Sequence, residues 1–267
     1  MGSRDEEQQP RSTPEGWWDG FYHDLLAEVL LVREDGAELE ATLAFLTERL
    51  ELAPGQRVFD QCCGIGSLTL PFAERGLEAI GADLSAVYIE RAQAEAARRG
   101  VNARFACADA FTWLPEAPCD AAFNWYSSFG YARTDAQNLE MLKRAFEALK
   151  PGGRFALDVP NMAGLIRHFQ PVLLKRREVE GVGEVVLVRE SELDLARGQL
   201  NQVWTWVLPD GARREDRSAL RLYLPHRIGA MLEACGFEEV AFCAGVDGRA
   251  LTADTLRCIV TARRPNA

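Results

Sequence analysis

The stretch Val58-Phe59-Asp60-Gln61-Cys62-Cys63-Gly64-Ile65-Gly66-Ser67-Leu68-Thr69 decides the fold of this chain. An apolar start, an acidic residue and two glycines before a helical pattern predict a strand that turns sharply into a helix. Gly64 and Gly66 let the backbone approach a ligand closely, and the start of the helix offers unpaired N–H groups. The same glycine spacing also serves ordinary tight turns, so the stretch alone leaves both readings open.

Outward from this turn, short apolar runs alternate with helical patterns that end at glycine. Strands of this kind joined by helices of this length predict βαβ units with right-handed crossovers. We therefore expect a parallel sheet covered by helices on both faces. The expected strands span residues 77–82, 103–108, 120–125 and 154–159, and the expected helices span 67–75, 86–99 and 135–149.

The segments on either side of this alternation have a different character. Helical spacing predicts two helices before the core, over residues 17–31 and 38–51. Between residues 160 and 225, Asp210-Gly211 separates two runs rich in Val, Leu and Trp, which is a strong hairpin signal. We expect an inserted three-stranded antiparallel meander there, over 184–195, 199–208 and 212–224, followed by a helix (225–235) and two final strands (237–242 and 256–262).

Composition and charge narrow the kind of partner. The chain has 267 residues, 48% of them apolar, and a formal net charge of −10. Because nucleic-acid footprints are normally basic, this charge favours a small-molecule partner and argues against nucleic acid. The chain could act as a monomer or a homodimer.

Cysteine use and the N-terminus indicate a cytoplasmic setting. The seven cysteines include no Cys-x-x-Cys pair and no spacing typical of zinc, so we expect no metal and reduced thiols. Residues 1–14 are polar and lack the apolar region of a signal peptide, and no stretch is long enough to span a membrane. We expect the N-terminus to be disordered.

Polar residues follow the ends of four expected strands, at Asp60, Asp83, Asp109 and Asn124. Ligands of open parallel sheets collect at these carboxyl ends. Asp83 could accept hydrogen bonds from ribose hydroxyls, or it could cap the helix that begins after Ser85. Asp109 could accept a bond from an adenine amino group, with Ala110 and Phe111 beside the ring, or it could be a turn residue.

At this point the chain resembles the class I S-adenosylmethionine-dependent methyltransferases. The resemblance is carried by DQCCGIGSLTLPFAERG, GADLSAVYIERA, ACADAF, CDAAFNW and LKPGGRFALD, in that order over about residues 56–160. It implies S-adenosylmethionine as cofactor, with methionine on the glycine-rich loop, ribose on Asp83 and adenine near Asp109. The implied cofactor-binding residues are Asp60, Cys62, Gly64, Gly66, Asp83, Leu84, Asp109, Ala110, Phe111 and Asn124. The family often has Gly where this chain has Cys62, which puts the local backbone angle in question.

Pattern and resemblance together predict an α/β fold of the Rossmann-like methyltransferase type: a seven-stranded, mostly parallel, doubly wound sheet with an inserted antiparallel β lid. The expected units are a disordered N-terminus (1–14), N-terminal helices that cover the site (15–55), a cofactor-binding α/β core (56–160), the lid (161–224), and a C-terminal helix with the last two strands (225–267).

The acceptor is expected beside the loop that follows Asn124, where four aromatic residues fall within seven positions. A binding pocket needs apolar walls with a few polar groups. The expected substrate-binding residues are Trp125, Tyr126, Phe129, Tyr131, Arg221 and Tyr223, although Trp125 and Phe129 could instead belong to the core. Arg221, Tyr223, His226 and Arg227 could bind a carboxylate or form an exposed cluster without a partner. The candidate catalytic residues are Tyr22, Tyr126 and His226.

The predicted activity is methyl transfer from S-adenosylmethionine to N, O or C of a small molecule, such as one of specialised metabolism. Such an in-line displacement mainly requires alignment and a dry pocket. The Asn-Pro-Pro-Tyr signature of many amino-base methylating enzymes is absent. Alternatives are a cyclase or lyase that consumes S-adenosylmethionine on the same fold, a cofactor-binding module without catalysis, and a nucleotide-cofactor oxidoreductase. Thr69 argues against the oxidoreductase because it replaces the third glycine of a dinucleotide loop.

Overall fold

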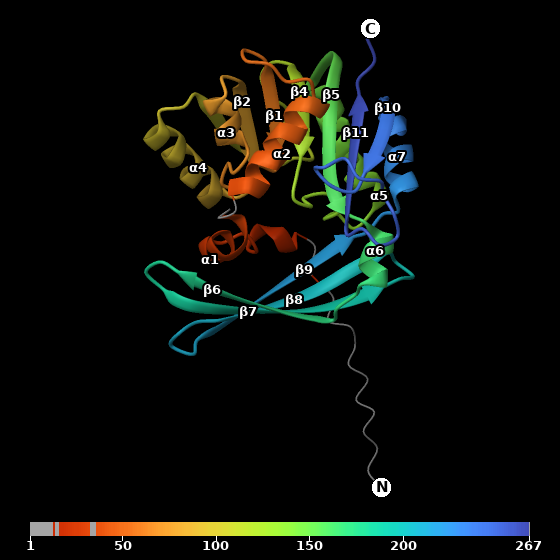
Figure 1. The fold of residues 1–267 in the computed structure, drawn as a ribbon. Coiled ribbons are helices and arrows are strands. Elements are labelled where there is room, and N and C mark those ends of the chain that lie inside the picture. Colours follow the sequence, from red (N-terminus) through yellow and green to blue (C-terminus); the bar gives the residue numbers. More distant parts are fainter. Residues whose placement is uncertain (1–12, 14–15, 33–35, 267) are drawn as a thin grey trace.

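The computed structural model describes residues 13, 16–32 and 36–266. The segment predicted to be disordered, 1–14, lies outside the described residues except for Thr13. Two sheets make up the fold, and Figure 1 shows one of them lying across the lower edge of the other. None of the helices in the described ranges is long and apolar enough to cross a membrane.

The main sheet has seven strands in the order β10-β11-β5-β4-β1-β2-β3. Strand order reverses between β1 and β4, which creates the crevice where ligands of such sheets bind. Strand β11 runs opposite to the other six strands and pairs antiparallel with both β10 and β5, so the predicted seven-stranded, mostly parallel sheet is confirmed. The strands are β1 (Arg57–Gln61), β2 (Glu78–Asp83), β3 (Ala103–Cys107), β4 (Cys119–Asn124), β5 (Leu149–Pro160), β10 (Glu238–Cys243) and β11 (Arg257–Arg263).

Helices cover both faces of this sheet. On one face α2 (Gly36–Arg49) and α3 (Thr69–Glu74) bury Leu43, Leu46 and Phe72 against the strands. On the other face α5 (Asp135–Glu147) and α7 (Pro225–Ala234) bury Met141 and Leu232. The sheet is therefore buried on both sides, as parallel sheets require. Two further helices, α4 (Ala86–Arg99) and α6 (Met162–Arg167), follow β2 and β5.

Local chemistry sets where the main helices begin and end. The Ser85 hydroxyl caps α4 by accepting the N–H of Tyr88, and α4 ends at Gly100 with a left-handed backbone. Thr134 and Gln137 form a capping box at the start of α5. One predicted boundary is wrong: β5 begins at Leu149, so Lys150-Pro151-Gly152-Gly153 belongs to the strand and not to a loop after the helix.

The lid sheet has four antiparallel strands rather than the predicted three. They are β6 (Val172–Val179), β7 (Gly183–Asp194), β8 (Gln199–Val207) and β9 (Arg213–Arg221), in that spatial order. Strand β6 was missed because its sequence VLLKRREV does not alternate between apolar and polar residues. As one of the two edge strands of the lid sheet it is largely exposed, so no buried face imposes that alternation.

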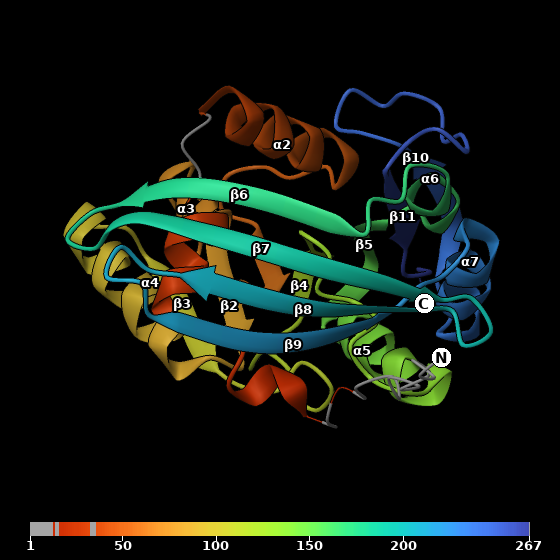
Figure 2. The same ribbon diagram turned by 90° about the horizontal axis from the view of Figure 1, so that it is seen from below.

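The N-terminal segment lies between the two sheets (Figures 1 and 2). It was predicted as one helix over 17–31, but it forms three short pieces: η1 (Trp17–Asp19), α1 (Asp24–Leu26) and η2 (Ala27–Leu31). The chain turns at Gly20, and the His23 ring then caps α1 by accepting the N–H of Leu26 at 3.2 Å. Because the segment reaches the lid on one side and the main sheet on the other, it joins the two layers.

Packing of the N-terminal segment against the lid is mainly apolar. Phe21, Leu26 and Val29 pack with Trp204 and Trp206, two tryptophans that share one face of β8. Their rings stack 6.4 Å apart and are buried, so they form the interlayer core. A polar contact adds to this layer, because His23 Nε2 lies 2.9 Å from the Asp216 carboxylate of β9.

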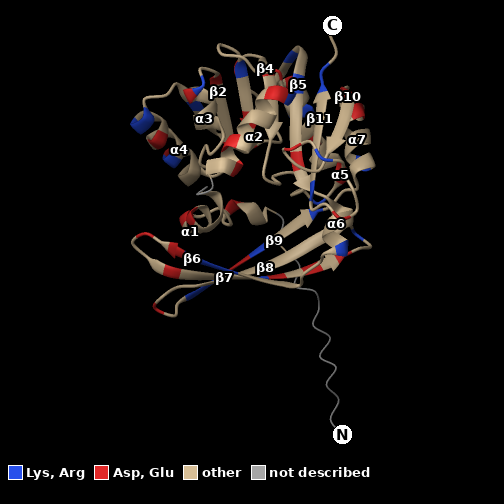
Figure 3. Cartoon of the chain, viewed as in Figure 1, with Lys and Arg blue, Asp and Glu red and all other residues tan. Residues whose placement is uncertain are grey.

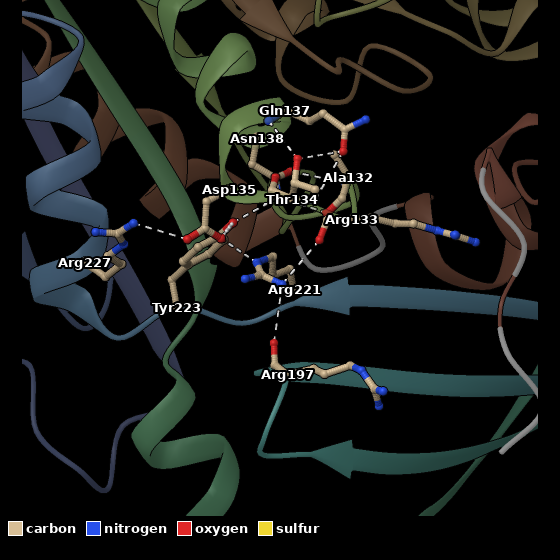
Figure 4. A network of polar contacts seen from close by, with 10 residues as sticks. All are labelled: Ala132, Arg133, Thr134, Asp135, Gln137, Asn138, Arg197, Arg221, Tyr223 and Arg227. Atoms are coloured by element: carbon tan, nitrogen blue, oxygen red, sulfur yellow. Dashed lines mark hydrogen bonds and ion pairs between the residues drawn. The ribbon is translucent and has the colours of Figure 1, made fainter.

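The lid is fastened to the core at the end of β9 (Figure 4). Arg221 donates its backbone N–H to the Gly130 carbonyl at 2.7 Å, and its guanidinium pairs with Asp135 at the start of α5. Tyr223 and Arg227 contact the same carboxylate at 3.1 and 3.2 Å. Burial works to raise the pKa of Asp135, but the bonds from the two arginines outweigh it and hold that pKa below its usual value.

Replacing Gly130 by alanine should therefore disrupt this junction. Gly130 has φ +104°, and an added Cβ would lie 2.4 Å from the Arg221 carbonyl oxygen. Left-handed strain and overpacking together should lower the free energy of unfolding by about 2 to 5 kcal/mol in urea denaturation. Gly100→Ala is the matched control, because Gly100 also has positive φ (+67°) but open space around it. Its cost should be about 1 to 2 kcal/mol, and equal losses in both variants would contradict the proposed close approach.

Candidate functional site

A cavity of about 290 Å³ lies at the carboxyl ends of the strands, beneath the N-terminal segment. Its floor comes from residues that follow β1, β2 and β3, and its roof comes from η1 and the residue two positions before α1. The lining consists of Trp18, Asp19, Tyr22, Cys62, Asp83, Leu84, Ser85, Asp109, Ala110, Phe111, Ser128, Tyr131 and Met141. This position agrees with the crevice expected where strand order reverses.

A smaller cavity of about 70 Å³ adjoins the first. It lies over the glycine-rich turn and is lined by residues that include Asp60, Gly64, Trp125 and Tyr126. Both cavities are lined by Cys62, Asp83 and Ser128. The site therefore has two compartments that meet at these three residues.

Asp83 fastens the glycine-rich turn to the end of β2. Its two carboxylate oxygens accept the N–H groups of Gly64 and Ser85, each at 2.9 Å. The cap of α4 is Ser85 and not Asp83, so the capping role considered from the sequence belongs to the neighbouring residue. Burial raises the pKa of Asp83, although the backbone bonds oppose that shift. Each carboxylate oxygen keeps a further lone pair that can accept from a ligand hydroxyl.

Asp60 is buried at the end of β1 and bonded by the residue that replaces the third glycine. The Thr69 hydroxyl donates to Asp60 Oδ2 at 2.6 Å. Burial raises the pKa of Asp60 to about 7, with a further contribution from the Asp83 charge, while the Thr69 bond works against the shift. The position where a dinucleotide loop would need glycine is therefore occupied by a residue whose hydroxyl bonds Asp60.

The backbone of the glycine-rich turn is left-handed at three positions. Gly64 and Gly66 have φ +55° and +80°, and a Cβ on Gly66 would lie 3.0 Å from the Phe105 ring. Cys62 has φ +66°. A non-glycine residue in this conformation costs about 1 to 2 kcal/mol. Cys62 thus keeps the backbone shape that glycine adopts freely, and its side chain lies between the two cavities.

Asp109 combines the turn role and the cavity position considered from the sequence. Its carboxylate accepts the N–H of Phe111 at 2.8 Å, and it lines the larger cavity together with Ala110 and Phe111. The Phe111 ring lies 6.4 Å from that of Trp18 on the N-terminal segment. One end of the cavity therefore combines an acidic group with two flat aromatic rings.

Two tyrosines close the roof of the larger cavity. The hydroxyl of Tyr22 donates to that of Tyr131, and their rings stack with centroids 6.3 Å apart. Burial raises the pKa of Tyr131 to about 12 and raises that of Tyr22 well above its ordinary value, where the neighbouring Tyr131 also contributes. Both hydroxyls are therefore protonated at neutral pH, which suits water exclusion and hydrogen bonding better than proton abstraction.

The remaining candidate residues divide into those at the cavities and those away from them. Trp125 and Tyr126 line the smaller cavity, with Trp125 only 3% exposed. Asn124 is buried behind the site and donates to the Gln61 side chain at 3.2 Å. Phe129, Arg221, Tyr223 and His226 line neither cavity: Phe129 is core, Arg221 and Tyr223 contact Asp135, and His226 lies exposed on α7. Arg221 and Tyr223 thus bind a carboxylate of the protein itself, Asp135, and do not form an exposed cluster without a partner.

Several residues of the site were missing from the sequence prediction. Trp18 and Asp19 enter the roof through η1, and Met141 reaches the cavity from α5. Ser128 was not predicted, although it lies among the four aromatic residues of the loop after Asn124. Among the described residues, no group of three His, Cys, Asp or Glu side chains is arranged to hold a metal ion.

The raised pKa of Asp60 predicts a pH-dependent stability. Its pKa of about 7 in the folded state exceeds its ordinary pKa of 3.8, so between these values the folded state holds a proton that the unfolded state lacks. The free energy of unfolding should fall as pH rises from about 4 to about 7, by up to about 1.4 kcal/mol per pH unit, and level off above. Urea denaturation of the wild type and of Asp60→Asn across this range measures the difference. A difference between them that does not change with pH would refute the assignment.

Comparison with known proteins gives the following matches. Residues 58–153 match a family model described as a methyltransferase domain. An RNA methyltransferase described as uncharacterized, from Thermosynechococcus vestitus, is 32% identical over 91 residues, which are 34% of this chain and 20% of that protein. The chain therefore spans about a fifth of the length of that curated relative.

Solved structures match over nearly the whole chain. The CcbJ methyltransferase from Streptomyces caelestis superposes with a TM-score of 0.77 at 20% identity, covering 93% of this chain and 99% of that one. CalS10, an amino pentose methyltransferase from Micromonospora echinaspora solved with bound S-adenosylmethionine, gives a TM-score of 0.68 at 20% identity, covering 91% and 98%. At this identity the matches show a shared fold.

Proposed function

We propose that this chain, which belongs to the class I S-adenosylmethionine-dependent methyltransferases, transfers the methyl group of S-adenosylmethionine to a small-molecule acceptor. The observation that carries the proposal is the pair of joined cavities at the carboxyl ends of β1, β2 and β3. One is bordered by aromatic rings and an acidic group, the other by the glycine-rich turn. That division suits a cofactor made of a nucleoside and an amino acid.

The residues present fit this cofactor part by part. Asp109, Phe111 and Trp18 would hold the adenine, and Asp83 would accept hydrogen bonds from the ribose hydroxyls. The smaller cavity, with Gly64 and Asp60, would take the amino-acid end. When bound, S-adenosylmethionine supplies an electrophilic methyl group on a positively charged sulfur.

The chain's own contribution is alignment and exclusion of water. Tyr22 and Tyr131 close the roof, and the buried lid layer supports them from behind. Holding the reactants in line lowers the entropic part of the barrier, and a dry site strengthens its electrostatic interactions. Both tyrosine hydroxyls keep their protons at neutral pH, so the site favours an acceptor atom that reacts without a strong base.

The charge of the lining supports a neutral or cationic acceptor. Asp19, Asp60, Asp83 and Asp109 line the two cavities, and within the described residues neither lining includes a Lys, Arg or His. Negative acceptors would be repelled by the ionised members of this set, of which Asp60, with its pKa of about 7, is only partly charged at neutral pH. Figure 3 shows acidic and basic residues interspersed over both layers of the described chain, without a continuous basic stretch in this view. These features favour a small molecule over a phosphate-rich RNA.

The state of the cysteines supports a cytoplasmic location. All seven are free thiols in the structure, including three that are buried. Free thiols persist where the compartment is reducing. We therefore place the proposed reaction in the cytoplasm.

Calorimetric titration with S-adenosylmethionine and with NAD tests the proposal. The wild type should bind S-adenosylmethionine and not NAD, because Thr69 occupies the third glycine position of a dinucleotide loop. Asp83→Asn should weaken S-adenosylmethionine binding by about 1.5 to 3 kcal/mol, since it removes a charged acceptor. Asp194→Asn, on the lid and outside both linings, is the control and should bind as the wild type does. Binding of NAD alone would overturn the proposed function, and unchanged affinity in Asp83→Asn would leave Asp83 only its role in fastening the turn.

A further inference from the structure

The loop after β4 contains two consecutive residues in an unfavourable backbone conformation. Tyr126 and Ser127 have φ +60° and +67°, in the left-handed region that residues other than glycine rarely adopt. We call these two residues the strained turn. Such strain persists only where the surroundings enforce it, and it concentrates at functional sites.

Asp158, at the carboxyl end of β5, receives both N–H groups of the strained turn. Its Oδ2 accepts the N–H of Tyr126 at 3.1 Å, and its backbone carbonyl accepts the N–H of Ser127 at 3.1 Å. The Asp158 side chain is only 3% exposed. A buried carboxylate is a strong acceptor for backbone N–H groups and fixes their direction.

Arg257, at the start of β11, in turn fixes Asp158. Arg257 Nε donates to Asp158 Oδ1 at 2.9 Å, and Nη2 lies 2.9 Å from Oδ2. The guanidinium therefore pairs with the carboxylate through two nitrogens. The same guanidinium lies 5.5 Å from the centre of the Trp125 ring. Arg257 therefore contacts both the residue before the strained turn and the carboxylate that holds it.

The strained turn contributes one of its two residues, Tyr126, to the wall of the smaller cavity. Trp125 and Tyr126 line that cavity, and Ser128, directly after the turn, lines both cavities at their junction. Neither Asp158 nor Arg257 is part of either lining. They can reach a ligand only through the turn that they hold.

We propose that Asp158 and Arg257 are positioning residues that hold the strained turn and thereby shape the compartment for the amino-acid end of S-adenosylmethionine. The inference rests on the proposed function, because it assigns the smaller cavity to that end of the cofactor. A turn fixed before binding presents Trp125, Tyr126 and Ser128 without further ordering when the cofactor arrives. Loss of the ion pair should affect that end of the ligand selectively.

Two ligands distinguish this role from general stabilisation. S-adenosylhomocysteine carries the nucleoside, a thioether sulfur and the amino-acid end, whereas 5′-methylthioadenosine carries the nucleoside and a methylthio group but no amino-acid end. Calorimetry with both should show that Asp158→Asn and Arg257→Gln weaken S-adenosylhomocysteine binding at least tenfold and 5′-methylthioadenosine binding less than twofold. Thermal unfolding of each variant identifies those that remain folded. Because the two substitutions lie on different strands, one variant still tests the inference if the other fails to fold.

A rescue variant and a matched control complete the experiment. Glycine adopts a left-handed backbone without steric cost. The double variant Asp158→Asn with Ser127→Gly should therefore bind S-adenosylhomocysteine at least threefold more tightly than Asp158→Asn alone. Ser127→Gly alone is measured as the reference for the double variant, because Ser127 belongs to the strained turn although it lines neither cavity. Asp120→Asn is the control: Asp120 also accepts a backbone N–H, from Arg57 at 2.8 Å, and pairs with Lys150, but at the opposite end of the strands.

The outcomes separate the two claims. Selective loss of S-adenosylhomocysteine with rescue by Ser127→Gly supports the inference. Equal weakening of both ligands, unchanged binding in folded Asp158→Asn and Arg257→Gln, or a similar loss in Asp120→Asn would overturn it while leaving the proposed function intact. A wild type that binds neither ligand would overturn the proposed function and this inference together.

Discussion

The site depends on one electrostatic constraint: three carboxyl groups lie at the carboxyl ends of parallel strands without a basic side chain among the described lining residues, with Asp60 buried, Asp83 half-buried and Asp109 exposed. Each is satisfied instead by uncharged donors. Thr69 bonds Asp60, Gly64 and Ser85 bond Asp83, and Phe111 bonds Asp109. These bonds orient the side chains but leave negative charge uncompensated, which is why burial raises the pKa of Asp60 and of Asp83.

An uncompensated acidic site favours a ligand that brings positive charge. S-adenosylmethionine carries a sulfonium and an ammonium group, so its binding would supply what the described lining lacks. The same hydrogen bonds also build the site mechanically, because Asp83 ties the turn after β1 to the end of β2. Charge, turn geometry and cavity shape are therefore consequences of the same few side chains.

The second layer closes this site and connects it to the lid. The N-terminal segment places Tyr22 over the cavity and packs its other face on Trp204 and Trp206. At the far end, Asp135 joins α5, β9 and α7 through Arg221 and Arg227. The lid is thus anchored at two separate places, and the loop that contains Ser128 and Tyr131 lies between the core and the end of β9.

The sequence predicted the features that follow from strand periodicity and failed at those that depend on distant partners. Asp83 and Asp109 could be placed because parallel strands end at one edge of the sheet, and the resemblance to a known family gave them roles. The Arg221 partner could not be identified, because Asp135 lies 86 residues away and nothing local signals the pairing. The left-handed turn at Tyr126 and Ser127 was missed for the same reason, since neither residue type indicates positive φ and the group that enforces it is Asp158 on another strand. Strand β6 was missed because an exposed edge strand needs no alternation.

The most direct test of the central claim is a crystal structure of the protein with S-adenosylhomocysteine. We predict adenine beside Asp109 and Phe111, ribose hydroxyls within hydrogen-bond distance of Asp83, and the amino-acid end in the smaller cavity over Gly64. A ligand bound in the opposite direction, or one bound outside both cavities, would contradict it.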